Sequence, residues 1–210
     1  MDFAVDIETI PDLSMIDLLP EVKPSRTLKD PAKIEQDLKE KKEKQIAEMG
    51  LDPVFAKVIC VSLYNPKENH ILIGEEKEIL TKFWEIIGNH GQLFTYNGRA
   101  FDMDVLLKRG LRYDVGYSKS FAVNCMLFRP KHMGGRVVDL MEVFCKYGEY
   151  RKLDTLAKIY LGKEKIDIDF NDFPELIKTA EGKAEIGRYC MKDAELTWEL
   201  AVKFGYDTNF

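Results

Sequence analysis

Polar and apolar residues alternate in several short stretches in the first half of the chain, which predicts β-strands. The first stretch is FAVDIET, residues 3–9, and Pro11 is expected to end it. Alternation places successive side chains on opposite faces of a strand, and β-branched residues favour this conformation. Further strands are predicted at 56–65, 69–75 and 92–98, with Asn65-Pro66 as the turn between the second and the third.

The second half of the chain is predicted to be mainly helical. In EKEILTKFWEIIGNHG, residues 76–91, apolar residues recur three and four apart until Gly88 or Gly91 ends the helix. Other helices are predicted at 102–110, 136–148, 152–162 and 182–205, with a loop and a short helix at 166–182 and mostly loop and helix at 111–136. Strands that come first and helices that dominate later indicate an α/β fold, a mixed sheet packed by helices.

The segment between the first two strands is unusually long. Residues 12 to about 54 contain four prolines, and DPAKIEQDLKEKKEKQIAEMG is predicted to be a charged helix closed by Gly50. Its mixed charges are typical of a solvated face rather than of a nucleic-acid arm. Loops of this length are usually functional or flexible. We expect a single domain over 1–210, with a partly helical insertion at about 12–54 that folds against it near a substrate cleft.

The composition is that of an ordinary globular protein, with 45% hydrophobic and 32% charged residues. The sequence has no basic leader and no apolar run near the ~20 residues of a spanning helix, so neither secretion nor membrane association is expected. The cysteines Cys60, Cys125, Cys145 and Cys190 form no CxxC pair. They are interpreted as reduced thiols of a cytoplasmic protein, with neither a zinc site nor a disulfide framework. The net charge of −5 opposes nucleic-acid binding, unless carboxylates gather around divalent ions that reverse the local sign.

Two carboxylates lie on one face of the first predicted strand. Asp6 and Glu8 are two residues apart and share their face with Ala4, while Val5 and Ile7 point to the other face. Two acids on a face that packs against a core are unfavourable unless a cation compensates them, and Mg²⁺ and Mn²⁺ prefer carboxylate oxygen. Alone the pair is a weak indication, because D-x-E is common at exposed strand ends.

Two more acids occur at the borders and faces of predicted helices. Asp102 ends the stretch YNGRAFD, where a strand passes into a helix, and helix capping is its alternative role. Tyr189 and Asp193 are four residues apart in the last helix and therefore share one face. The alternative there is an ordinary helix face with one aromatic residue and one acid.

Taken in order, D-x-E, N-x₃-F-D and Y-x₃-D resemble the three exonuclease motifs of the DEDD superfamily in its tyrosine-bearing branch. The chain is similar to stand-alone predicted 3′–5′ exonucleases related to the proofreading domain of family-B DNA polymerases. The similarity is carried by FAVDIETIPD, DPVFAKVICVS, LFTYNGRAFDMDVLLKR, VVDLMEVF, KLDTLAKIYLGKEK and IGRYCMKDAELTWEL. It implies a ribonuclease-H-like fold, a mixed sheet of about five strands flanked by helices. A stand-alone exonuclease is expected because the sequence ends soon after the last motif.

The resemblance implies that Asp6, Glu8, Asp102 and Asp193 hold two divalent metal ions, Mg²⁺ or Mn²⁺. Asp6, Glu8 and Asp193 would bind one ion, and Asp6 would bridge to the second with support from Asp102. Two ions ~3.5–4 Å apart stabilise the attacking and the leaving oxygen of an in-line phosphoryl displacement. Tyr189 would orient or deprotonate the attacking water.

Other positions refine this assignment. Asn97 and Phe101 match fixed positions of the second motif, where we infer substrate positioning, with a core role as the alternative for Phe101. The sister branch carries His five residues before the last Asp, and this chain has Arg188 there. Asp139 is a fixed acid of the related family, but we interpret it as an acid favoured at a helix N-terminus and leave it out of the metal set.

We therefore expect an enzyme that hydrolyses the 3′ end of single-stranded nucleic acid, with DNA favoured and RNA as the alternative. Candidate phosphate contacts are Arg99, Lys131, Arg136, Arg151 and Lys152. The competing functions are a catalytically inactive nucleic-acid-binding module of the same fold, a ribonuclease-H-like endonuclease and a structural protein. The intact acid set argues against the first and the third, and the Tyr-x₃-Asp helix argues against the second.

Overall fold

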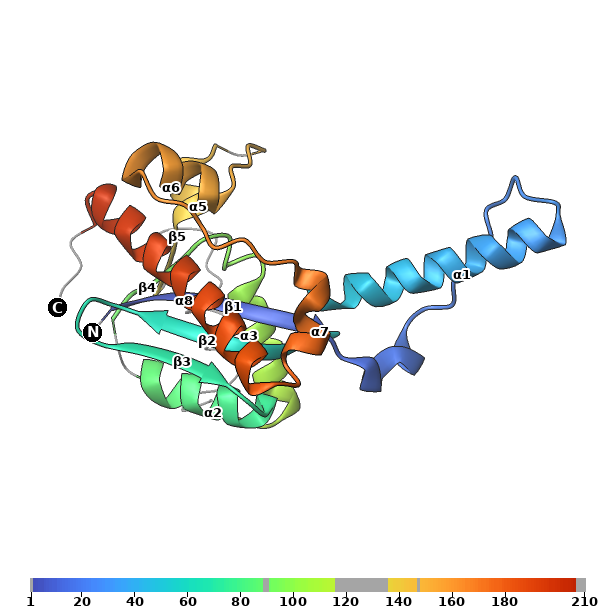
Figure 1. The fold of residues 1–210 in the computed structure, drawn as a ribbon, viewed down its shortest axis with the longest axis horizontal. Helices are drawn as coiled ribbons and strands as arrows, with labels where there is room; N and C mark the ends of the chain where they lie inside the picture. The colour runs from blue at the N-terminus through green and yellow to red at the C-terminus, as the bar shows by residue number, and fades with distance from the viewer. Residues whose placement is uncertain (1, 89–90, 116–135, 147, 207–210) are drawn as a thin grey trace.

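A mixed β-sheet forms the centre of the molecule (Figure 1). The structure is a computed structural model that describes residues 2–88, 91–115, 136–146 and 148–206. Within these residues the sheet has five strands in the order β3-β2-β1-β4-β5. They are β1 (Phe3–Pro11), β2 (Ala56–Tyr64), β3 (Asn69–Ile73), β4 (Leu93–Thr95) and β5 (Val137–Asp139). β2 runs antiparallel to β1 and β3, whereas β4 runs parallel to β1 and β5.

Helices cover both faces of this sheet (Figure 1). α2 (Glu76–Ile87) and α3 (Asp102–Arg112) pack on one face, and α8 (Ala180–Lys203) crosses β1 and β2 on the other. α6 (Leu153–Leu161) and α7 (Phe173–Leu176) pack against α8, while α5 (Leu140–Phe144) follows β5. Short 3₁₀ helices are η1 (Leu13–Leu18), η2 (Met49–Leu51) and η3 (Phe170–Asp172). None of the helices described is both long and apolar enough to cross a membrane.

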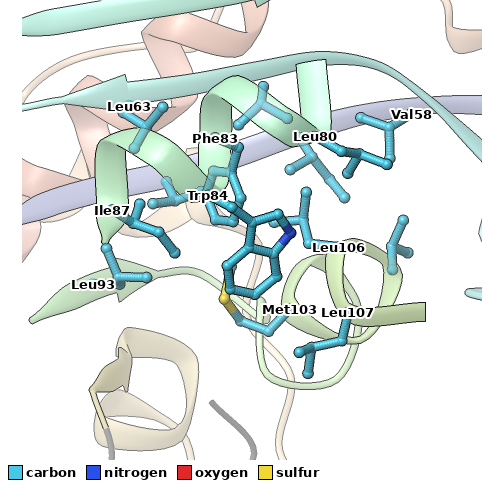
Figure 2. Packing of buried hydrophobic residues seen from close by; sticks show 14 of the residues in the cluster. Val58, Leu63, Leu80, Phe83, Trp84, Ile87, Leu93, Met103, Leu106 and Leu107 are labelled. Atoms are coloured by element: carbon cyan, nitrogen blue, oxygen red, sulfur yellow. The ribbon is translucent and has the colours of Figure 1, made fainter. Parts of the chain in front are cut away.

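The alternation of the first strand is reproduced by its packing. Val5 and Ile7 belong to the apolar cluster between the sheet and helices α2 and α3, in which Trp84 packs beside Met103 (Figure 2). Ala4 lies on the opposite face, in a cluster with residues of α6 and α8. The face of β1 that carries Asp6 and Glu8 is therefore the face covered by α8.

One predicted helix begins as a strand in the structure. Val137–Asp139 is a strand parallel to β4, not the start of a helix over 136–148. Three residues are too few to show alternation, and the helix-forming residues that follow dominate the pattern. The first strand ends at Pro11, as predicted, and Pro11 pairs with Ala56. β4 pairs with β1 only at Phe3 and Ala4, so the missing N–H of proline interrupts no ladder with β4.

The insertion contains the predicted helix but does not fold against the domain as expected. α1 (Pro31–Glu48) has no buried residue and projects away from the sheet (Figure 1). The Asp30 side chain caps its first turn by accepting from the Ala32 N–H, and pairs such as Lys41 with Asp37 add local support. Only its base is anchored, where Thr9 Oγ1 donates to the Gly50 carbonyl at 2.6 Å.

One buried arginine ties the sheet to the helices on one face. Arg109 of α3 is only 1% exposed, and its guanidinium donates to both oxygens of Glu76 at 2.7 and 2.5 Å. It also contacts Asp12, just beyond β1, at 2.7 Å. The Glu76 carboxylate further accepts from the Val58 N–H of β2 and the Tyr113 hydroxyl. A buried charge with this many partners is satisfied, but removing one partner exposes the desolvation penalty of the others.

Arg109→Met should lower the free energy of unfolding by about 3–5 kcal/mol, because it leaves Glu76 buried without its cation. The measurement is urea denaturation at 25 °C. Arg112→Met is the matched control, since Arg112 lies on the same helix and pairs with Asp12 but is 38% exposed at its side chain. The control should lose at most about 1 kcal/mol. Equal losses in the two variants would contradict a special role for the buried pair.

Candidate active site

Strand β1 carries two acids, Asp6 and Glu8, on the face that is covered by α8. Glu8 is 7% exposed, and no hydrogen bond or ion pair joins its carboxylate to another described residue. Asp6 lies one pleat earlier on the same face, and its Oδ2 atom is buried without a hydrogen-bond partner in the described structure. A hydrophobic core does not ordinarily contain two carboxylates that lack hydrogen-bond and ion-pair partners.

Helix α8 brings the C-terminal motif against these acids. Close approach of the helix to the sheet is permitted at Gly187, where a Cβ atom would lie 2.9 Å from Ile71 Cγ2. One turn on, the Cys190 thiol donates to the backbone carbonyl of Asp6 at 3.3 Å. Asp193, 4% exposed, lies a further turn along the same helix. The predicted shared face of Tyr189 and Asp193 is therefore turned toward β1.

Asp102 joins the site from the start of α3. Its carboxylate accepts from the backbone N–H of Ile7, beyond the point where β4 pairs with β1. Burial is the main cause that raises the pKa of Asp102 to about 7, and the charge of Asp193 adds to the shift. Asp102 is therefore close enough for the charge of Asp193 to affect its pKa, although α3 and α8 pack on opposite faces of the sheet.

The ligand atoms that approach most closely belong to Asp6, Glu8 and Cys190. They lie within 4.8 Å of one another. Asp193 stands next to this group, and its Oδ2 atom is ion-paired with Lys165. Its Oδ1 atom is buried and has no hydrogen-bond partner among the described residues. The structure therefore groups Asp6 and Glu8 with a thiol, while Asp193 and Asp102 lie outside this group but near enough for their charges to raise the pKa of Asp6. The thiol and Lys165 were not indicated by the sequence pattern.

The electrostatics of the cluster favour a bound cation. Burial raises the pKa of Asp6 well above its ordinary value, and the charges of Asp193 and Asp102 raise it further. The pKa of Glu8 is raised in the same way, first by burial and then by Asp6. Burial raises the pKa of Asp193 as well, against the opposing charge of Lys165. Carboxylate oxygens that are buried, close together and unpartnered fit a divalent ion, because hard cations select such a donor set.

Tyr189 is held as a neutral phenol at the edge of the acids. Burial raises its pKa, and the charges of Asp193 and Glu8 raise it further. A hydrogen bond from its hydroxyl in turn lowers the pKa of Asp193. The ring packs edge-on against Phe170 and Phe173, which fixes its orientation. A phenol in this environment is a hydrogen-bond donor rather than a metal ligand or a free base.

Lys165 is the functional candidate that the sequence analysis missed. It lies in the loop after α6, where no helical or strand periodicity predicts its direction. In the structure its Nζ atom pairs with Asp193 and lies 5.2 Å from the centre of the Tyr189 ring. The only sequence signal is its position inside KLDTLAKIYLGKEK, a segment that carries the family resemblance.

The loop before α3 is organised by Asp139. Its carboxylate accepts from the backbone N–H groups of Asn97 at 2.8 Å and Arg99 at 3.0 Å, and also caps α5 through Met141. Asn97 adopts a φ of 63°, a left-handed conformation that asparagine tolerates better than most residues. Asp139 therefore has the helix-terminal role predicted for it. Phe101 is partly buried against the cluster of α2 and α3, so its ring contributes to the core.

The candidate phosphate contacts separate into two groups. Arg99 pairs with Glu142 at 3.2 Å, and Arg136 donates to backbone carbonyls at the end of α2, so both guanidiniums support the fold. Arg151 and Lys152 are exposed. Lys131 lies outside the described residues.

A cavity of about 590 Å³ lies beside Lys165, which pairs with Asp193. Its lining combines aromatic residues with equal numbers of lysines and acids: Tyr150, Phe170, Tyr189, Lys152, Lys158, Lys165, Asp154, Glu164 and Asp167. Aromatic faces beside cations are the features on which single-stranded nucleic acid stacks and pairs. The cavity therefore places aromatic rings and charges of both signs next to Lys165 and Tyr189.

Comparison with solved structures identifies the class of fold. The family-B DNA polymerase of the hyperthermophilic archaeon Pyrobaculum calidifontis aligns with 97% of this chain at a TM-score of 0.64, with 15% sequence identity over 24% of the polymerase chain. The mixed sheet flanked by helices is thus a ribonuclease-H-like fold.

The sequence comparisons identify the family. Residues 53–208 match the family of predicted 3′–5′ exonucleases related to the exonuclease domain of PolB, and the chain belongs to this family. It is 29% identical over 141 residues to DNA polymerase 1 of Sulfolobus acidocaldarius, which covers 61% of this chain and 15% of that protein. It is 41% identical over 61 residues to the DNA polymerase catalytic subunit of human cytomegalovirus strain AD169, covering 28% of this chain and 5% of the viral protein. The family is one of predicted 3′–5′ exonucleases, and the chain spans only a small part of the length of the polymerases that it matches.

Removing one acid should stabilise the protein when no metal is present. Asp6→Asn relieves the repulsion among the buried acids, and a gain of 1 kcal/mol corresponds to roughly 2–4 °C in Tm for a chain of this size. Thermal unfolding in EDTA tests this, with the exposed acid variant Asp17→Asn as control. Mn²⁺ should raise the Tm of the wild type more than that of Asp6→Asn. A lower Tm for Asp6→Asn in EDTA would contradict this account of the site.

Proposed function

We propose that the chain hydrolyses phosphodiester bonds one at a time from the 3′ end of single-stranded nucleic acid, with two divalent ions as cofactors. The observation that carries the proposal is the set of neighbouring acids Asp6, Glu8 and Asp193. Asp6 Oδ2 and Asp193 Oδ1 are buried without a hydrogen-bond partner among the described residues, and Glu8 is 7% exposed. The family match supports the 3′ to 5′ direction. DNA is the favoured substrate, because the relatives described above are DNA polymerases.

Different sets of acids would bind the two ions. Asp6, Glu8 and Asp193 would hold one ion, and Asp6 together with Asp102 would hold the other. When bound, such ions lower the pKa of water and stabilise charge on the attacking and leaving oxygens. Lys165 holds Asp193 in place, and as a cation it also compensates part of the negative charge near the incoming phosphate.

The remaining residues position the water and the strand. The Tyr189 hydroxyl stays protonated and would orient the attacking water by a hydrogen bond. Asn97, in the loop held by Asp139, would contact the phosphate or sugar of the terminal nucleotide. Phe101 would present an edge of its partly buried ring to the terminal base. Tyr150 and Phe170 line the way out, where the bases of the departing strand would stack.

Cleavage should require the metal and the acids. With Mg²⁺ or Mn²⁺, 5′-labelled single strands should shorten to a ladder from the 3′ end, and EDTA should stop the reaction. Asp6→Ala should abolish cleavage while Asp17→Ala retains it, because only Asp6 belongs to the acid cluster. Matched DNA and RNA strands in the same assay identify the preferred sugar.

Other outcomes of that assay indicate other functions. Internal cuts would indicate an endonuclease. Strands that are retarded on a native gel but remain intact would indicate an inactive binding module of the same fold. Activity of Asp6→Ala close to that of the wild type would contradict the two-ion proposal.

Tyr189→Phe should lower kcat by roughly 10²–10⁴, the usual scale for a positioned proton-transfer group. Metal affinity should remain close to that of the wild type, because no ligand or charge is removed. Single-turnover cleavage and metal titration measure the two effects, with Asp193→Asn as the variant that loses metal. Tyr160→Phe, an aromatic change on α6, is the control. Wild-type cleavage by Tyr189→Phe would mean that the tyrosine only packs.

Single-stranded 3′ ends should be degraded faster than blunt duplex. A strand that reaches the buried acids through the cavity must separate from its complement, at a cost of a few kcal/mol. Rates on a single strand, a blunt duplex and a duplex with a 3′ overhang at one salt concentration provide the measurement. The overhang should be degraded quickly until the duplex is reached. A faster rate on the blunt duplex would contradict this route to the site.

A further inference from the structure

The Cys190 thiol belongs to the group of ligand atoms formed with Asp6 and Glu8, and the buried thiol of Cys60 on β2 contacts it from outside that group. Cys190 is fully buried on the face of α8 that contacts β1, and its sulfur lies within 4.8 Å of the nearest ligand oxygens of Asp6 and Glu8. Its S–H group donates to the Asp6 backbone carbonyl at 3.3 Å, so the sulfur is held against the strand that carries both acids. Cys190 has no place in the proposed hydrolytic chemistry, which uses oxygen ligands.

The two acids beside this thiol have the properties of unfilled ligands. Glu8 is 7% exposed and makes no hydrogen bond or ion pair within the described part of the chain. Asp6 Oδ2 is likewise buried and without a hydrogen-bond partner there. Three ligand atoms from two elements, two of them oxygens that lack partners, therefore surround one position. The observation does not depend on the cysteine alone.

We propose that Asp6, Glu8 and Cys190 form a mixed oxygen–sulfur site for a thiophilic divalent ion, with Zn²⁺ as the physiological candidate. Zn²⁺ accepts thiolate at about 2.3 Å and carboxylate at about 2.0–2.2 Å, which small side-chain movements can provide here. Mg²⁺ requires oxygen ligands in near-ideal octahedral geometry and gains nothing from sulfur. The thiol therefore gives the acid pair a preference for Zn²⁺ over Mg²⁺.

Binding of the ion replaces the proton of the Cys190 thiol. The Cys190 S–H bond breaks, its proton leaves to solvent, and a bond forms between sulfur and the ion. No oxidant or reductant takes part. Because Asp6 and Glu8 also serve the proposed exonuclease, an ion held by the thiol occupies their oxygens and excludes the hydrolytic pair of ions. The inference rests on the proposed function only for this inhibitory consequence, and the site itself is independent of it.

Cd²⁺ is the probe, because its thiolate bond gives a charge-transfer absorption in the ultraviolet that Mg²⁺ and carboxylates do not produce. One equivalent of Cd²⁺ should produce this band in the wild type, and Cys190→Ser and Cys190→Ala should both lose it. Cys60→Ser and Cys145→Ser are the controls and should retain the band, since neither thiol belongs to the group of ligand atoms formed by Asp6, Glu8 and Cys190. Glu8→Gln should weaken Cd²⁺ binding at least tenfold while retaining the band at saturation.

The variants carry their own test of folding. A Mn²⁺-dependent rise in Tm should persist in Cys190→Ala, which shows that the acids remain in place when the thiol is removed. The proposal is overturned if the wild type gives no band, if Cys190→Ala retains it, or if Glu8→Gln binds Cd²⁺ as tightly as the wild type.

The cleavage assay separates this inference from the proposed function. Strand degradation in Mg²⁺ without a Cd²⁺ band would overturn the sulfur site alone. A Cys190-dependent band in a protein that degrades no strand would overturn the exonuclease proposal alone. If both hold, Zn²⁺ should inhibit Mg²⁺-dependent cleavage by the wild type at a concentration at least tenfold lower than for Cys190→Ala.

Discussion

The mutual repulsion of carboxylates buried between β1 and α8 is the constraint on which the rest of the structure depends. Strand pairing and helix packing must hold Asp6, Glu8 and Asp193 together, although the charge of Asp193 raises the pKa of Asp6 and the charges of both raise the pKa of Glu8. The apolar clusters on both faces of the sheet supply the packing that offsets this penalty. Lys165 reduces it further by pairing with one acid. A rigid scaffold thus keeps unfavourable charge in position, where a cation can convert it into binding energy.

The chain buries acids in two distinct ways, and the contrast separates support from chemistry. Glu76 has a full set of partners in Arg109, Tyr113 and the Val58 N–H, and Asp139 accepts from three backbone N–H groups. Such acids stabilise loops and helix ends. Asp6 and Asp193 each retain an oxygen without a partner in the described structure. The degree of satisfaction, rather than burial alone, therefore marks the acids that are available to a ligand.

Local patterns predicted much of this fold because most elements are long enough to show their period. The alternation around Asp6 correctly placed both motif acids on one face, and the four-residue spacing placed Tyr189 with Asp193. The strand Val137–Asp139 was not predicted because three residues are too few to show a period. It forms a strand because it pairs with β4. The role of Lys165 was not predicted for another reason. Its loop has no repeating pattern, so only tertiary contacts place its side chain beside Asp193. The thiol of Cys190 was likewise dismissed from spacing, although the helix turns it toward β1.

The projecting insertion is a site at which the chain could be cut into two fragments that stay associated. A protease that cuts within the solvent-exposed α1 would separate β1 from the rest of the chain covalently, but the strand would stay paired with both β2 and β4. The short piece would carry Asp6 and Glu8, and the long piece would carry Asp102 and Asp193. Neither fragment holds a complete set of acids. The arm therefore offers a place to split the protein into complementing halves whose reassociation rebuilds the site.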